Sequence, residues 1–150
     1  MKSVDTIRSI LSRKGLELWS VAPTATVYEA IEKMSDKGVG ALLVMSGGQL
    51  AGIISERDYA RKVILKERSS KQTLVREIMT ISVITATPGD NVEDCMRTMT
   101  ENRIRHLPVV DSGGQVVGIV SIGDLVNWII TAHEETIGHL QSYIAGNYPG

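Results

Sequence analysis

GGQLAGIISERDYAR (residues 47–61) and GGQVVGIVSIGDLVN (residues 113–127) are two versions of the same stretch of sequence. Both contain Gly-Gly-Gln, then Gly-Ile and then Ser-x-x-Asp, while the residues in between differ. Upstream of residue 47 the copies stay aligned with an offset of 65, which pairs Pro23 with Pro88 and Met34 with Met99. The offset becomes 66 after Ser46, in a turn where hairpin loops tolerate a change of length. The chain is therefore an internal duplication.

Each copy predicts the same order of elements, β-α-β-β-α. A short extended segment precedes a helix whose apolar residues recur with a period of 3.6, as Val27, Ala30 and Met34 do in the first copy. Two strands then form a hairpin through a Gly-Gly turn, and the second helix begins after Ser55 or Ser121, each an N-cap serine with an acid three positions later. The expected extended segments and strands span residues 17–21, 41–45 and 50–55 in the first copy and residues 83–86, 106–111 and 116–121 in the second.

The expected fold class is α/β (α+β), with two β-α-β-β-α motifs packed about a pseudo-two-fold axis. Apolar runs such as ALLVM are too continuous for strands with one wet face, so both faces of each sheet are expected to be covered. A unit of about 60 residues buries only about 60% of the surface that its unfolded chain exposes, so each copy needs the other. The expected boundaries are an N-terminal helix in residues 1–15, the first motif in 16–66, a linker in 67–76, the second motif in 77–131 and a C-terminal helical extension in 132–150.

Composition argues against several classes of function. The net charge of −1, with 22% charged residues, provides no basic field for nucleic acid. Charges interrupt the apolar residues of the N-terminal stretch, so neither a signal peptide nor a membrane span is expected, and the protein is assigned to the cytoplasm. The single cysteine, Cys95, excludes an internal disulfide and a Cys-x-x-Cys motif, and its helical spacing with Val92, Met96 and Met99 predicts a place in the core.

The duplicated stretch resembles a known regulatory family. TENRIRHLPVVDSGGQVVGIVSIGDLV (residues 100–126) closely resembles the second motif of a tandem cystathionine-β-synthase (CBS) domain pair, or Bateman module, and GVGALLVMSGGQLAGIISERDYARKV (residues 38–63) resembles the same motif. The resemblance extends over residues 16–130. It implies a stand-alone signal-transduction module that binds adenosine-containing ligands between its two motifs, commonly as a dimer.

The resemblance also implies which residues form the two sites. Asp58 and Asp124 are the expected acceptors for the ribose hydroxyls, because a carboxylate can accept charge-assisted hydrogen bonds from both of them. Ser55 and Ser121 are expected to add hydroxyl contacts. The remaining residues implied for the Asp58 site are Thr80, Val83, Ile84, Arg103, Ile104, Arg105, His106 and Pro108, together with Arg57. Those implied for the Asp124 site are Trp19, Ser20, Val39, Gly40 and Ala41.

The two sites are expected to differ in charge. Arg57, Arg103 and Arg105 surround Asp58 with guanidinium groups suited to phosphate, whereas glycine and alanine take the equivalent places around Asp124. We therefore expect the Asp58 site to prefer a compact phosphorylated nucleotide such as AMP. The Asp124 site, nearly uncharged, is expected to admit neutral or larger ligands, including a dinucleotide such as NAD(H).

Motifs for catalysis and metal binding are incomplete. KGVGALLV (residues 37–44) lacks the third glycine of a dinucleotide-binding turn and precedes a strand, and the chain has no P-loop motif. HEETIGH (residues 133–139) lacks the second histidine of a His-Glu-x-x-His zinc site, and His106 has no nucleophile at readable spacing. No enzyme activity, catalytic cofactor or metal is expected.

The predicted function is a non-enzymatic sensor of energy or redox state. It would bind AMP, ADP or ATP and NAD(H) between its motifs, form a homodimer, and regulate an unidentified protein in trans, with no role for nucleic acid or membrane. Two alternatives stay open: an S-adenosylmethionine sensor, and a ligand-independent dimerisation scaffold. The scaffold is suggested by Leu125, Val126, Trp128, Ile129 and Ile130, which cover more faces of one helix than an internal core needs.

Overall fold

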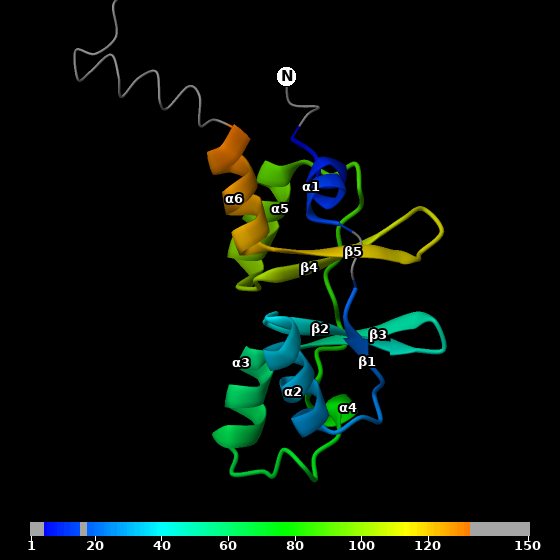
Figure 1. The fold of residues 1–150 in the computed structure, drawn as a ribbon, viewed down its shortest axis with the longest axis vertical. Helices are drawn as coiled ribbons and strands as arrows, with labels where there is room; N and C mark the ends of the chain where they lie inside the picture. Colours follow the sequence, from blue (N-terminus) through cyan, green and yellow to red (C-terminus); the bar gives the residue numbers. More distant parts are fainter. Residues whose placement is uncertain (1–4, 16–17, 133–150) are drawn as a thin grey trace, which may run out of the picture.

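The two copies of the repeat form two similar halves stacked on each other (Figure 1). The structure is a computed structural model that describes residues 5–15 and 18–132. The predicted C-terminal extension beyond Ala132 and the HEETIGH stretch lie outside the described residues. The helices are α1 (Ile7–Lys14), α2 (Val27–Lys37), α3 (Glu56–Tyr59), α4 (Val75–Ile78), α5 (Val92–Asn102) and α6 (Ile122–Ala132). The strands are β1 (Ser20–Val21), β2 (Ala41–Ser46), β3 (Gln49–Ser55), β4 (His106–Val110) and β5 (Val116–Ser121).

The repeated sequence produces repeated strand pairing. In the first half β1 pairs in parallel with β2, and β2 pairs antiparallel with β3. In the second half β4 and β5 form the equivalent hairpin, and a single parallel bridge between Ala86 and Val109 takes the place of the β1 pairing. Both hairpins shift register at the same position, after Val44 in one and after Val109 in the other. The predicted α+β fold of two related motifs is therefore confirmed, although residues 83–86 form a bridge rather than a strand.

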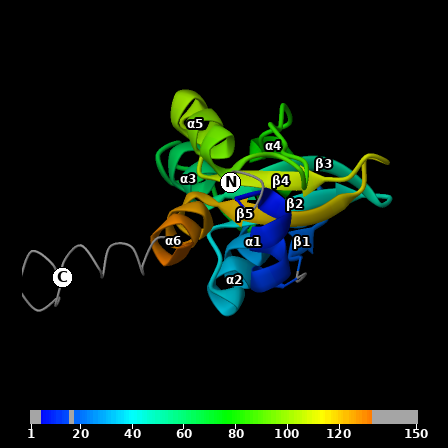
Figure 2. The same cartoon turned by 90° about the horizontal axis from the view of Figure 1, so that it is seen from above.

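Helices α3, α5 and α6 lie at one end of the sheets and both hairpin turns lie at the other, whereas α1 and α4 lie closer to the middle (Figures 1 and 2). Helix α2 begins at a capping box in which Thr26 accepts a hydrogen bond from the Glu29 amide and the Glu29 side chain accepts one from the Thr26 amide. Helix α3 begins at the same device, built from Ser55 and Asp58, and continues as a π-helical segment, Ala60–Ile64. The serine-acid spacing thus sets the start of α3, as the sequence predicts. No described helix is long and apolar enough to cross a membrane.

Each half has its own core. Helix α1 contributes Ile7, Ile10 and Leu11 to the core of the second half, next to α5, α6 and the β4–β5 hairpin. The segment that joins the halves contributes Val75 and Ile78 to the core of the first half. The piece of chain that precedes each motif thus packs on the opposite motif, which ties the halves together.

Backbone hydrogen bonds show that α1 and α4 are equivalent. The amides of Val75 and Arg76 donate to the carbonyls of Ala25 and Pro23. In the second half the amides of Ile7 and Arg8 donate to the carbonyls of Asp90 and Pro88, which lie 65 residues further along the chain than Ala25 and Pro23. The sequence did not reveal this match, because α1 and α4 lie outside the aligned repeat.

Candidate functional site

A cavity of about 460 Å³ lies between the two halves, next to Asp58. Its wall combines the start of α3 and its π-helical continuation with the segment after α4 and the segment between α5 and β4. The lining residues are Gly40, Ile53, Ser55, Glu56, Arg57, Asp58, Arg61, Lys62, Thr80, Ser82, Val83, Ile84, Arg103, Ile104, Arg105 and His106. The residues implied by the resemblance for the Asp58 site therefore meet at one cavity, with the exception of Pro108. That proline is buried in β4, where its carbonyl accepts a hydrogen bond from Ala86.

Hydrogen bonds and an ion pair hold Asp58 in place in the first turn of α3. Its Oδ2 accepts hydrogen bonds from the Ser55 amide at 3.0 Å and the Ser55 hydroxyl at 3.1 Å. Its Oδ1 lies 3.2 Å from Nζ of Lys62, one helical turn further on. Only 13% of the Asp58 side chain is exposed. The contacts with Ser55 and Lys62 therefore orient the carboxylate before a ligand hydroxyl binds to it. Capping and ligand binding are compatible roles for this residue, because a carboxylate has about four acceptor positions.

Five cationic side chains line the same cavity: Arg57, Arg61, Lys62, Arg103 and Arg105. Arg57 reaches across to the other half, where Nη1 donates to the carbonyl of Arg103 at 3.0 Å. Lys62 donates to the carbonyl of Ile78 at 2.9 Å. Sequence reasoning missed Arg61 and Lys62, although their spacing of three and four residues from Asp58 places them on the same face of a helix.

Four further lining residues were assigned to the other site or missed: Gly40 was implied for the Asp124 site, and Ile53, Glu56 and Ser82 were not predicted. A Cβ at Gly40 would lie 3.3 Å from a carboxylate oxygen of Glu56 and 3.7 Å from Cε1 of His106, so Gly40 lies against both side chains. Gly40 lines the Asp58 cavity, whereas the resemblance implied it for the Asp124 site. Burial lowers the pKa of His106, and the nearby charges of Lys14 and Arg105 lower it further, against the opposing effect of Asp124. His106 is therefore neutral at pH 7.

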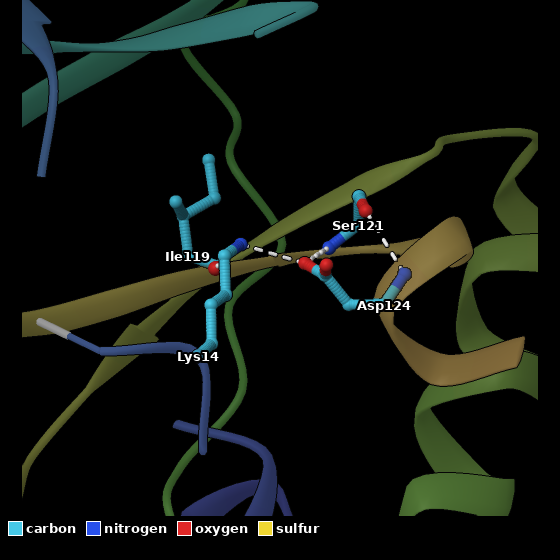
Figure 3. A network of polar contacts seen from close by, with 4 residues as sticks. All are labelled: Lys14, Ile119, Ser121 and Asp124. Carbon is cyan, nitrogen blue, oxygen red and sulfur yellow. Dashed lines mark hydrogen bonds and ion pairs between the residues drawn. The ribbon is translucent and has the colours of Figure 1, made fainter. Parts of the chain in front are cut away.

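Asp124 has a different set of neighbours (Figure 3). Its Oδ2 accepts a hydrogen bond from the Ser121 amide at 2.9 Å, and its own amide donates to the Ser121 hydroxyl at 3.1 Å, which repeats the geometry of Ser55 and Asp58. Nζ of Lys14 lies 2.6 Å from the same Oδ2 and 2.8 Å from the carbonyl of Ile119. Burial raises the pKa of Asp124, but the hydrogen bonds from Lys14 and Ser121 outweigh it and lower the pKa overall. The expectation of nearly uncharged surroundings is wrong, because α1 brings a lysine to this carboxylate.

The other residues implied for the Asp124 site belong to the first half and make contacts within it. The Trp19 carbonyl accepts from the Leu43 amide, and Nζ of Lys37 lies 4.5 Å from the Trp19 ring centre. Ser20 pairs with Leu43 in the sheet. Val39 packs against the core of the first half, and Ala41 is buried opposite Ser55. Among the described residues, none of these four forms a hydrogen bond with Asp124.

Comparison with known proteins gives the family. The sequence model of the CBS domain matches residues 7–65 and 75–131. The mitochondrial CBS domain-containing protein CBSX3 of Arabidopsis thaliana is 44% identical over 153 residues, covering 95% of this chain and 73% of the relative. These two matches span both halves.

Solved structures agree with this result. A putative signal-transduction protein with CBS domains from Burkholderia ambifaria is 50% identical, with a TM-score of 0.81 over 84% of this chain and 94% of the other. A CBS domain protein from Pyrobaculum aerophilum, solved in complex with AMP, is 25% identical with a TM-score of 0.71 over 79% of this chain and 88% of the other. The CBS domain pair of protein MJ0100, solved with 5′-methylthioadenosine and S-adenosyl-L-methionine, is 27% identical with a TM-score of 0.73 over 83% and 94%. With two matched domains and the same fold, this chain belongs to the CBS domain family, as a pair of CBS motifs that together form one structure.

Proposed function

We propose that this chain is a non-catalytic regulatory module that senses cellular energy or redox state by binding adenosine-containing nucleotides between its two CBS motifs. The observation that carries the proposal is the cavity at Asp58, where a preoriented carboxylate and five cationic side chains meet between the halves. The AMP complex of the Pyrobaculum aerophilum relative supports the ligand class.

The lining chemistry supports a mononucleotide monophosphate such as AMP in the Asp58 cavity, with ADP and ATP as related ligands. Asp58 would accept hydrogen bonds from the ribose hydroxyls, each worth about 1.5–3 kcal/mol as a charge-assisted bond. The apolar side chains of Ile53, Val83, Ile84 and Ile104 offer surfaces for the adenine ring. Arg57, Arg103 and Arg105 supply guanidinium groups for phosphate. A volume of about 460 Å³ is in the range of sites that hold one small ligand. NAD(H) remains part of the proposal as a ligand of the Asp124 side.

Regulation follows from the position of the cavity. Because its wall is built from both halves, a bound nucleotide stabilises the present arrangement of the halves relative to any other. At 100 times its dissociation constant a ligand contributes about 2.7 kcal/mol to the state that binds it. This free energy is sufficient to change contacts with a second copy or with a regulated protein. The proposed module forms a homodimer, regulates another protein in trans and is located in the cytoplasm.

Isothermal titration calorimetry of the full chain with AMP, ADP, ATP, NAD⁺ and S-adenosylmethionine tests the proposal. We expect AMP to bind, and Asp58→Ala to weaken AMP binding at least tenfold, because the variant removes both ribose hydrogen bonds. Asp94→Ala is the matched control, since Asp94 is an exposed aspartate on α5 that pairs with Arg97. Unchanged AMP affinity in Asp58→Ala, with the fold intact by circular dichroism, contradicts the assignment of Asp58.

Two other functions have specific support. Preference for S-adenosylmethionine over AMP in the same titrations would favour the methyl-donor sensor, which the ligands of the MJ0100 pair suggest. A ligand-independent scaffold is suggested by α6, where Val126 is 39% and Ile130 55% exposed, one turn apart. Leu125, by contrast, is fully buried in the core of the second half, and Trp128 and Ile129 pack against that core. Only some of the apolar side chains of α6 are therefore available to contact a second copy. Dimers that form without binding any adenosine compound would favour the scaffold.

A further inference from the structure

We propose that Lys14 competes with the sugar of an adenosine ligand for Asp124, and so makes the second cleft the weaker of the two. The inference rests on the proposed function, because it concerns the second of the two nucleotide sites. It assigns an affinity-determining role to a residue of α1, which lies outside the repeated motif. The contacts of α1, the equivalent position in the first half, and the acceptor atoms of Asp124 each support it.

Helix α1 is fixed at both ends, so Lys14 is delivered to a defined place. Near its start, the carboxylate of Asp5 accepts a hydrogen bond at 3.1 Å from Nε1 of Trp128 in α6. Near its end, the guanidinium of Arg13 lies 4.7 Å from the centre of the Trp128 ring. In between, Leu11 packs so closely on β5 that a Cβ at Gly118 would lie 2.6 Å from it. Lys14 is the last residue of this anchored helix.

The first half shows what Lys14 replaces. There, the carbonyl of Ile53 accepts a hydrogen bond at 2.9 Å from the amide of Thr80, a backbone segment that forms a wall of the Asp58 cavity. The equivalent carbonyl in the second half, that of Ile119, accepts from Nζ of Lys14 at 2.8 Å. Among the described residues, a lysine ammonium therefore contacts the carbonyl of the second half (Figure 3) whose equivalent in the first half meets a neutral backbone amide.

The ammonium also occupies the carboxylate that the sugar needs. Oδ2 of Asp124 accepts from both the Ser121 amide and Lys14, at 2.9 and 2.6 Å. The Ser121 and Lys14 bonds use both acceptor positions of Oδ2, so a ribose hydroxyl that binds at this oxygen would have to replace a charge-assisted bond to a cation, and the exchange costs part of the binding free energy. The side chains of Lys14 and Asp124 are 37% and 27% exposed, so solvent moderates the pair, and the expected cost is about fivefold in affinity.

Lys62 provides the contrast. It also contacts its aspartate, at 3.2 Å, but on the other carboxylate oxygen, and it lines the cavity together with four arginines. If Lys62 turned from Asp58 toward a phosphate of the ligand, its positive charge would still be paired with an anion. At the position equivalent to Lys62 the second half has Trp128, which is bound to Asp5. We therefore expect opposite effects from removing the two lysines: Lys62→Met weakens binding at the Asp58 cavity, whereas Lys14→Met strengthens binding at Asp124.

The test measures AMP and adenosine binding by calorimetry in an Asp58→Ala background, which isolates the second cleft. We expect Asp58→Ala/Lys14→Met to bind about fivefold more tightly than Asp58→Ala, and Lys14→Arg to show no gain because the charge stays. Adding Asp124→Ala should abolish the gain. Adenosine carries no phosphate, so a gain for both ligands separates competition for the sugar from an effect on phosphate.

Weaker or unchanged binding after Lys14→Met overturns the inference. Weaker binding would mean that Lys14 contacts the ligand, and unchanged binding would mean that Lys14 has no effect on it. This failure is distinct from that of the proposed function, which is measured in the wild-type chain as binding that depends on Asp58. If wild-type chain binds AMP through Asp58 and Lys14→Met changes nothing, only the role of Lys14 is wrong. If neither cleft binds any adenosine compound in any variant, both proposals are wrong.

Discussion

Arg103 and Gly38 end equivalent helices in the same left-handed backbone conformation, with φ of 55° and 67°. Glycine adopts this conformation freely, whereas an arginine does so at a cost of about 1 kcal/mol. The second half therefore carries strain at a position where the first half carries none. Arg103 also lines the Asp58 cavity, and strained residues tend to gather at functional sites.

Replacing Arg103 with glycine should separate stability from binding. We expect Arg103→Gly to leave the free energy of unfolding within about 0.5 kcal/mol of wild type, because relief of strain offsets the greater entropy of the unfolded chain. AMP affinity should fall, because one guanidinium is lost from the cavity. Urea denaturation and calorimetry measure the two quantities. Gly38→Ala is the reverse control and should destabilise by about 1 kcal/mol; equal stability losses in both variants would contradict this account.

Two glycines allow close packing and should not tolerate alanine. A Cβ at Gly52 would lie 2.7 Å from the backbone oxygen of Thr80, and one at Gly118 would lie 2.6 Å from Cδ2 of Leu11. A side chain can rotate away but a backbone carbonyl cannot, so Gly52→Ala should destabilise more than Gly118→Ala, with losses of about 1–3 kcal/mol. Thermal and urea unfolding check the order.

Gly89→Ala is the control for this pair, since a Cβ there meets nothing within 4 Å and its φ is compatible with alanine. It should be neutral. Combining Gly118→Ala with Leu11→Ala should cost less than the sum of the single changes, because truncation of Leu11 makes room for the Cβ added at Gly118. Full additivity would show that Leu11 is not the residue that Gly118 accommodates.

Stability should fall as the pH drops below about 6.5, because of His106. Burial, then Lys14, lower its pKa in the folded protein, whereas the unfolded chain has the ordinary value of about 6.5. The unfolded state therefore binds more protons than the folded state as the pH falls through 6.5, and linkage reduces the free energy of unfolding there. Urea unfolding of wild type and His106→Gln at pH 7.5 and pH 5 measures the difference, which should be smaller in the variant. Equal pH dependence in both would show that other groups cause it.

Cys95 should resist thiol reagents until the protein unfolds. It is buried in the core of the second half, and burial, followed by the charges of Asp90 and Asp94, raises its pKa to about 11. The reactive thiolate is therefore scarce and inaccessible at pH 8. Labelling with an aromatic disulfide should be slow in buffer and fast in urea, with the change at the unfolding midpoint. Rapid labelling of the folded chain would contradict the burial of Cys95.

Local patterns accounted for the elements inside the repeat. The spacing of Ser55 and Asp58 predicted the start of α3, and the Gly-Gly turns predicted both hairpins, because capping and positive-φ turns depend on a few neighbouring residues. The resemblance also led to most of the residues that line the Asp58 cavity, since they lie within the repeated motifs. Binding of a nucleotide there remains a prediction.

The sequence by itself determined that the chain is a duplication, and with it the two-motif fold and the pair of Ser-x-x-Asp sites. Only the tertiary structure decided that α1 completes the second half and brings Lys14 to Asp124, 110 residues away in the chain. The spacing of residues in the sequence does not predict such a contact, because the contact depends on how a helix outside the repeat packs on Gly118 and Trp128. Equal motifs thus acquire unequal surroundings from the segments that pack on them.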